Sequence, residues 1–119
     1  MEPHSTQDVN VESLAGSRDD IRIIKLRGPL MINNFFAFQD LARRQPLEHT
    51  LLIDLADVPY IDSAALGSLI GIHVSCERAG RKYALVGANA RLKNLFTISG
   101  VDQFLVTYPT IAEAESGLG

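Results

Sequence analysis

A buried apolar segment that leads into a helix of small residues constrains this chain more than any other feature. Residues 50–55 form a near-continuous apolar run of strand length, which is typical of a central strand covered on both faces. Pro59 lies in the loop that follows, and from Ser63 to about Arg78 apolar residues recur at helical spacing. A doubly buried strand followed by a helix is characteristic of a parallel sheet flanked by helices. The chain is therefore expected to have an α/β fold.

The strands expected elsewhere place this unit in a larger sheet. Residues 9–14 and 21–26 have strand character and are separated by a turn at 16–20, so we expect an antiparallel hairpin. Further strands are expected at 82–86 and at 104–107. Because helices alternate with the later strands, these strands should be parallel and joined by right-handed crossovers. The expected sheet is mixed, mostly parallel, and has four to five strands.

About four helices are expected, three of them outside the central unit. They cover residues 35–44, residues 90 to about 99, and a segment from Thr110 that Glu113 supports in a capping-box arrangement. Asn33 or Asn34 is placed to cap the first of these. Phe35, Phe36 and Phe38 crowd that helix, so at least one must face the core, and packing is favoured over an interface role. Residues 1–8 are polar and are expected to form a disordered tail, which leaves residues 9–119 as one domain.

Composition and charge exclude several classes of function. The 119 residues suit one compact domain, and the net charge of −3 with scattered basic residues disfavours a nucleic-acid binder. No segment resembles a signal peptide or is long enough to cross a membrane, so we expect a cytoplasmic protein without a membrane partner. Cys76 is expected to be a small buried side chain in a reducing compartment.

Nothing in the sequence points to catalysis, a cofactor or a metal. His4, His49 and His73 have no metal-ligand spacing, although His73 is expected to be partly buried. Ser63 lacks the flanking glycines of a nucleophile elbow and has no histidine in a convincing context as a base. Asp54 and Asp57 could be read as a pair of catalytic carboxylates. The favoured interpretation is that they make turn hydrogen bonds and keep the end of the strand soluble. We expect a binding module rather than an enzyme.

Ser63 is the strongest candidate for a functional residue. A hydroxyl at the start of a helix lies where unpaired N–H groups and the helix dipole favour negative charge. Ala64, Gly67 and Ser68 are small, so the backbone of a partner could approach this hydroxyl closely. The site is therefore suited to docking and to phosphorylation. The alternative is a simple helix cap, and the sequence leaves open whether Asp62 or Ser63 fills that role.

Three features of the chain resemble the STAS domain, and in particular the bacterial anti-sigma factor antagonists. The first is the passage LLIDLADVPYIDSAALGSLIGI, in which a strand and a loop lead to Asp-Ser followed by small residues. The second is KYALVGANARLKNLFTISGVDQFL, and the third is the two-strand start that ends at Gly28. Residues 28–33 depart from the family pattern because they contain no acid where antagonists often have an aspartate. The resemblance covers roughly residues 9–118.

This resemblance implies a phosphorylation-switched binding module. Ser63 would be phosphorylated by the partner, an anti-sigma factor with serine kinase activity, and the unmodified form would sequester that factor and so regulate transcription. A phosphatase acting on phospho-Ser63 would reset the cycle. The implied partner-binding residues are Asp57, Tyr60, Asp62, Ser63, Ala64, Gly67 and Ser68. The alternative is a STAS scaffold subunit of a larger signalling or lipid-transport assembly that is not phosphorylated.

Overall fold

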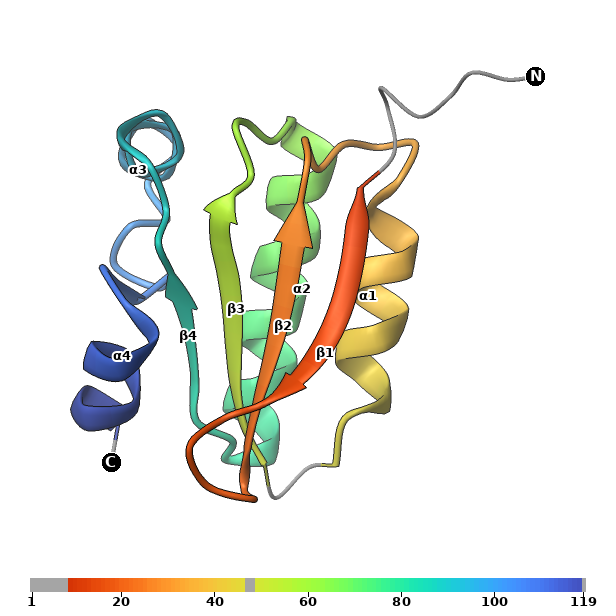
Figure 1. Cartoon of the computed structure of the whole chain (residues 1–119). Coiled ribbons are helices and arrows are strands. Elements are labelled where there is room, and N and C mark those ends of the chain that lie inside the picture. Colours follow the sequence, from red (N-terminus) through yellow and green to blue (C-terminus); the bar gives the residue numbers. More distant parts are fainter. Residues whose placement is uncertain (1–8, 47–48, 119) are drawn as a thin grey trace.

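The computed structural model describes residues 9–46 and 49–118, which form a five-stranded sheet with helices on both faces (Figure 1). The α/β fold predicted from the sequence is confirmed, whereas the predicted tail at residues 1–8 lies outside the described residues. The elements follow in the order β1 (Asn10–Ala15), β2 (Ile21–Arg27), α1 (Phe35–Arg44), β3 (Thr50–Asp57), α2 (Ser63–Ala79), β4 (Tyr83–Val86), α3 (Ala90–Ile98), β5 (Thr107–Tyr108) and α4 (Ile111–Leu118).

The strands lie in sequence order across the sheet, from β1 at one edge to β5 at the other. β1 pairs antiparallel with β2, as the hairpin prediction required, and every later pair is parallel. β3 is therefore the central strand, and its residues Leu51–Leu55 are all buried. Because β2, β3 and β4 run in the same direction, the loops that leave them gather at one edge, which we call the carboxyl edge.

The sheet separates the apolar core into a larger layer on one face and a smaller layer on the other. α1 and α2 lie side by side on one face of the sheet, as Figure 1 shows, and the main core there includes the fully buried rings of Phe38 from α1 and Phe96 from α3. On the other face α4 buries Ala114 against a smaller group that includes Ile23 and Leu52. The larger layer positions the start of α2 at the carboxyl edge.

The last strand is shorter and later than the sequence predicted. Residues 104–106 were expected in this strand, but β5 consists of Thr107 and Tyr108 only. The amides of Phe104 and Leu105 both donate to the carbonyl of Val101 at 3.0 Å, so these two residues form a turn. Hydrogen bonding to β4 begins at Val106, whose carbonyl accepts from the Leu85 amide at 2.9 Å. Of residues 104–106, only Leu105 is buried in the core, which accounts for part of the apolar character that suggested a strand.

The predicted caps are confirmed at α4 and only partly at α1. The Thr110 hydroxyl accepts a hydrogen bond from the Glu113 amide at 3.1 Å, as a capping box requires. Asn34 occupies the cap position of α1, but its side chain makes no capping hydrogen bond. Its carboxamide oxygen instead accepts from the amide of Met31 at 2.8 Å, which stabilises the preceding turn.

Glu115 attaches α4 to the turn between β1 and β2 and should make this contact sensitive to acid. Its carboxylate accepts from the Ser17 hydroxyl at 2.6 Å and from the Ser17 amide at 3.1 Å, and these hydrogen bonds lower the pKa of Glu115 below its ordinary value of 4.5. A depressed pKa in the folded state means that the stabilisation is present above the unfolded-state pKa and is lost as the pH falls through the folded value.

We expect the amides of α4 to lose hydrogen-exchange protection as the pH falls below about 4.5 in the wild-type chain. Glu115→Gln should show reduced protection of α4 already at neutral pH, with little further loss in acid. Glu77→Gln, which changes an exposed glutamate on α2, is the matched control and should behave as wild type. Identical pH profiles for the two variants would contradict the role of Glu115.

Candidate functional site

Three loops meet at the carboxyl edge of the sheet and are joined by hydrogen bonds. The loop after β2 runs alongside the loop after β3. The Leu30 amide donates to the Tyr60 carbonyl, and the Asp62 amide donates to the Leu30 carbonyl, both at 3.2 Å. From the loop after β4, the Asn89 side-chain amide donates to the carbonyls of Val58 and Pro59, both at 3.3 Å. The start of α2 is therefore held from both sides.

Asp62 is the cap of α2, which settles the alternative that the sequence left open. One of its carboxylate oxygens accepts from the Ala65 amide at 2.9 Å, and the other accepts from the Ile32 amide, also at 2.9 Å. A charged acceptor that bridges two backbone amides is a strong contact of this kind. Asp62 thus ties residues 28–33, which contain no acid of their own, to the start of α2.

Ser63 is the first residue of α2, and its side chain is exposed. Because Asp62 makes the capping bond, the Ser63 hydroxyl is not needed for it and has no hydrogen-bond partner among residues 9–46 and 49–118. It lies at the positive end of a 17-residue helix. The site can therefore accept a negatively charged group on this oxygen without losing a contact in the domain.

All but one of the other residues predicted at the docking surface are at least partly exposed. Asp57, Tyr60 and Gly67 are exposed, and Ala64 is half-buried. Ser68 is only 6% exposed, because its position on α2 turns it toward the domain interior. Ser68 was predicted to contact a partner, but its side chain is not part of the accessible surface of this structure. A Cβ built on Gly67 would meet nothing within 4 Å, so packing inside the domain does not require glycine at this position.

Residues 14–114 match the family model of the STAS domain. The chain belongs to the STAS domain family. A candidate anti-sigma factor antagonist of Thermotoga neapolitana is 31% identical over 99 residues, which cover 81% of this chain and 88% of the relative. An anti-sigma-B factor antagonist of Staphylococcus epidermidis is 25% identical over 100 residues, covering 82% of this chain and 91% of the relative.

The crystal structure of a candidate anti-sigma factor antagonist from Thermotoga maritima superposes with a TM-score of 0.82. The two sequences are 26% identical, and the match covers 91% of this chain and 93% of the other. The STAS fold predicted from the sequence is thus confirmed by family and by structure.

Two large exposed apolar side chains near the beginning of α1 were not assigned to the site from the sequence. Ile32, whose amide binds Asp62, is 64% exposed, and Phe36 in the first turn of α1 is 67% exposed. Phe38 is fully buried and Phe35 is half-buried, so the STAS core uses only part of this phenylalanine cluster. The sequence signal was the crowding itself, because neighbouring residues on a helix cannot all face the same side.

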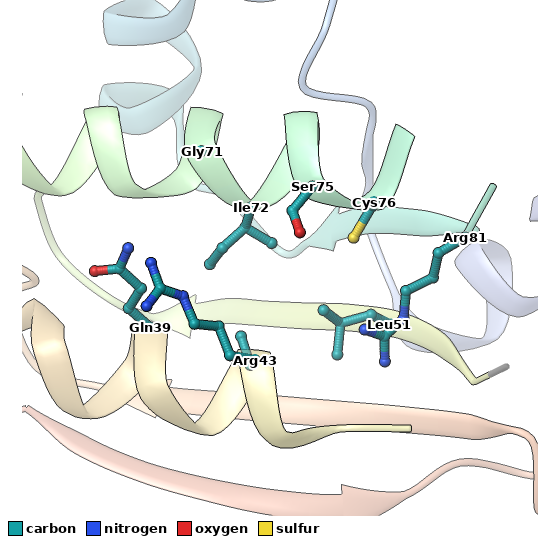
Figure 2. Close-up of a pocket in the computed structure, with 9 residues that line it drawn as sticks. Gln39, Arg43, Leu51, Gly71, Ile72, Ser75, Cys76 and Arg81 are labelled. Atoms are coloured by element: carbon teal, nitrogen blue, oxygen red, sulfur yellow. The ribbon is translucent and has the colours of Figure 1, made fainter. Parts of the chain in front are cut away.

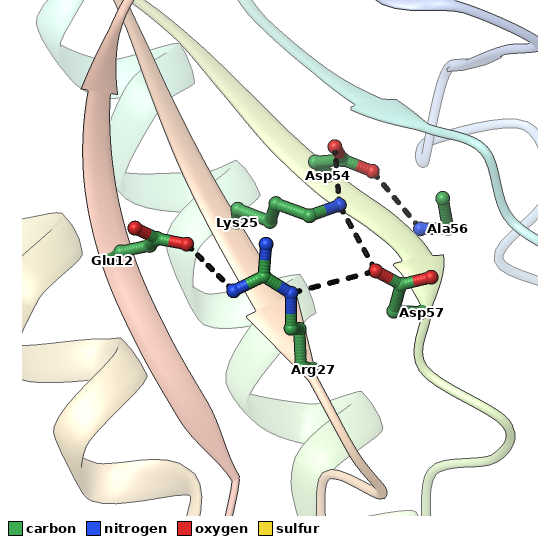
Figure 3. A network of polar contacts seen from close by, with 6 residues as sticks. All are labelled: Glu12, Lys25, Arg27, Asp54, Ala56 and Asp57. Carbon is green, nitrogen blue, oxygen red and sulfur yellow. Dashed lines mark hydrogen bonds and ion pairs between the residues drawn. The ribbon is translucent and has the colours of Figure 1, made fainter.

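A network of charged side chains lies where β1, β2 and β3 approach the carboxyl edge (Figure 3). The Lys25 ammonium lies between the carboxylates of Asp54 at 3.1 Å and Asp57 at 3.3 Å. Arg27 continues the network, contacting Asp57 at 3.6 Å and Glu12 at 2.8 Å. Burial alone would lower the pKa of Lys25, but the hydrogen bonds to both aspartates raise it above its ordinary value.

This network corrects the interpretation of Asp54. Its expected turn hydrogen bond is present, since the carboxylate accepts from the Ala56 amide at 3.0 Å. Asp54 is not a solubility residue, however, because it is only 7% exposed and its charge is compensated by Lys25. Asp57 is exposed, as that interpretation required. Periodicity does not reveal such a pair, because the lysine stands on another strand.

The remaining candidates have structural roles in this STAS domain. His73 is half-buried between the rings of Tyr83 and Phe104, with centroid distances of 6.0 and 6.2 Å. Cys76 is buried, as predicted, and burial raises the pKa of its thiol. Across the described part of the chain, no group of three histidine, cysteine or acidic side chains is placed to hold a metal ion. No helix among these residues has the length and apolar character needed to span a membrane.

Proposed function

We propose that this STAS domain is an anti-sigma factor antagonist that binds its anti-sigma factor when Ser63 is unmodified and releases it when Ser63 is phosphorylated. The observation that carries the proposal is the exposed, unbonded hydroxyl of Ser63 at the start of α2. The partner is itself the serine kinase, and a phosphatase restores the unmodified state. Relatives that are named as anti-sigma factor antagonists support this assignment.

The physics of the switch follows from where the phosphate would lie. A phosphoserine carries nearly two negative charges and three acceptor oxygens, which the start of α2 can accommodate. Asp62 already places a carboxylate beside this position. A partner that packs closely on Ser63, Ala64 and Gly67 would have to bury the phosphate, which is costly without a cation to pair with it. Phosphorylation would then weaken binding while the STAS domain remains folded.

The exposed side chains of Ile32 and Phe36 supply the apolar contacts that such a partner needs. Exposed aromatic and aliphatic residues that become buried at the centre of an interface commonly carry much of its binding energy. Ile32 donates its amide to Asp62, the residue that precedes Ser63, and Phe36 lies in the first turn of the helix that follows. In this arrangement the apolar side chains provide affinity, and Ser63 controls it.

Ile32→Ser and Phe36→Ser should each weaken binding of the anti-sigma factor about tenfold or more. The free energy of unfolding should change little, because the two side chains are 64% and 67% exposed. Ile98→Ser is the matched control, since Ile98 at the end of α3 is 75% exposed. Calorimetric titration with the purified anti-sigma factor measures the three affinities. Equal affinities for all three variants would remove Ile32 and Phe36 from the interface.

The proposal is tested by capturing the tagged protein from its native host and identifying both partner and modification by mass spectrometry. We expect an anti-sigma factor in the unphosphorylated complex and a phosphate on Ser63 in the free fraction. A captured assembly without an anti-sigma factor, and with Ser63 unmodified throughout, would overturn the proposal in favour of a scaffold subunit.

A further inference from the structure

A pocket of about 200 Å³ lies between α1 and α2, away from Ser63 (Figure 2). α1 contributes Gln39 and Arg43, and α2 contributes Gly71 and Ser75. Leu51, at the beginning of β3, also lines it, whereas the loop to Ser63 leaves from the other end of that strand. Ser75 is twelve residues beyond Ser63 on the same helix, which places the two about 18 Å apart along the axis.

The inner surface of this pocket is apolar and its rim is cationic. The side chains of Leu51, Ile72 and Cys76 are at most 7% exposed and form the deeper surface. Arg43 and Arg81 both line the pocket, and no carboxylate is among the lining residues. A lining with two guanidinium groups and no acidic residue is notable in a chain whose net charge is −3. The pocket therefore favours an anionic group that is attached to an apolar body.

The two arginines differ in how they are held. Arg81 donates to the carbonyls of His49 at 2.7 Å and Pro46 at 2.9 Å, which fixes its guanidinium beside Leu51 in Figure 2. Arg43 makes neither an ion pair nor a hydrogen bond with any residue that the structure describes. In Figure 2 its side chain extends from α1 toward Ile72 on α2. Arg43 is thus a cation available to a ligand, next to a second, fixed cation.

The ends of the two helices do not need the Arg43 side chain. At the end of α1, the Gln45 amide donates to the Ala42 carbonyl at 3.4 Å, and the Gln45 side chain donates to the Leu41 carbonyl at 3.0 Å. At the end of α2, the amide of Arg81 donates to the Cys76 carbonyl at 2.8 Å. Capping of the helix carbonyls therefore does not explain why the Arg43 guanidinium lies at this pocket.

We propose that the pocket between α1 and α2 binds a small organic carboxylate, with the carboxylate on Arg43 and the apolar body on Leu51, Ile72 and Cys76. Guanidinium groups match the planar geometry of carboxylates and can bind them through two parallel hydrogen bonds. The Gln39 amide and the Ser75 hydroxyl are further donors in the lining. The size of the pocket limits the ligand to a small acid, since drug-sized ligands occupy about 300–1,000 Å³.

Benzoate is a suitable probe, because it joins a carboxylate to a small apolar ring. Titration of the ¹⁵N-labelled chain should produce saturable shifts at the amides of Gly71, Ile72 and Ser75, with a dissociation constant of about 1 mM. Benzamidine has the same ring with a cationic head group and should bind at least about tenfold more weakly, because the cationic rim repels it. The experiment needs no anti-sigma factor, so its result is independent of the proposed function.

Arg43→Gln should weaken benzoate binding about tenfold, the effect of losing one charged hydrogen-bonding group. Arg44→Gln is the matched control, since Arg44 is the next residue but pairs with Asp40 at 2.9 Å, and its side chain is 73% exposed. Its benzoate affinity should equal that of the wild type. Absence of saturable shifts, equal binding of benzamidine, or equal effects of the two substitutions would each overturn the proposal.

Discussion

Ser63→Asp is expected to weaken binding of the anti-sigma factor about 100-fold, which corresponds to about 2.8 kcal/mol. Ser63→Ala should bind as tightly as the unmodified chain. The aspartate places a negative charge at the first position of α2, beside the Asp62 carboxylate and in the surface where the partner is proposed to pack. Burying this charge without a counter-ion is the source of the lost affinity.

The same substitution should leave the STAS domain folded, because acidic residues are favoured in the first turn of a helix. Ser75→Asp is the matched control: it adds the same charge to an exposed position of α2, about 18 Å along the helix from Ser63. We expect its affinity for the anti-sigma factor to be unchanged, since the Debye length at physiological salt is about 8 Å. Calorimetric titration measures the affinities, and urea unfolding shows whether each variant remains stable.

Equal affinity of the Ser63→Ala and Ser63→Asp variants for the anti-sigma factor would refute the switch. Loss of affinity in the Ser75→Asp control as well would indicate a general effect of charge on the interaction. The fold does not depend on either outcome.

Local chemistry was sufficient to predict most of the fold and the position of Ser63. The apolar run at residues 50–55 is the central strand. It could be recognised because a parallel strand that is covered on both faces is apolar along its whole length. The helix that begins at Ser63 ends at Gly80, which adopts the left-handed conformation expected of a terminal glycine. These features depend only on residues that are close together in the sequence.

Features that depend on contacts between distant segments could not be predicted in this way. Asp54 is buried because Lys25 lies opposite it on β2, and nothing near Asp54 in the sequence indicates that partner. Ser68 shares the small size of its neighbours but faces inward on α2. The exposure of Phe36 likewise depends on how α1 packs on the sheet. Sequence spacing thus identified the helix that begins at Ser63, whereas tertiary packing decided which of its residues are accessible.

Lys25→Met should lower the free energy of unfolding by about 3–5 kcal/mol, the effect expected when one partner of a buried ion pair is removed. Methionine preserves the length of the side chain but leaves the Asp54 carboxylate without a cation in a site where its side chain is 10% exposed. The raised pKa of Lys25 means that the contribution of the pair is complete below the unfolded-state pKa and is lost only as the pH rises through the folded value. Measurements at neutral pH therefore report its full effect.

Two further variants separate the buried pair from the surface part of the network. Arg27→Met should cost less than about 1 kcal/mol, because the Arg27 side chain is 52% exposed and its pairs with Glu12 and Asp57 are screened by solvent. Combining Lys25→Met with Asp54→Leu removes both buried charges and should restore most of the stability lost in the single variant. Urea unfolding of the variants measures these differences. If Lys25→Met costs no more than Arg27→Met, then water or another group compensates the Asp54 charge, and Lys25 does not stabilise the end of β3 from which the loop to Ser63 departs.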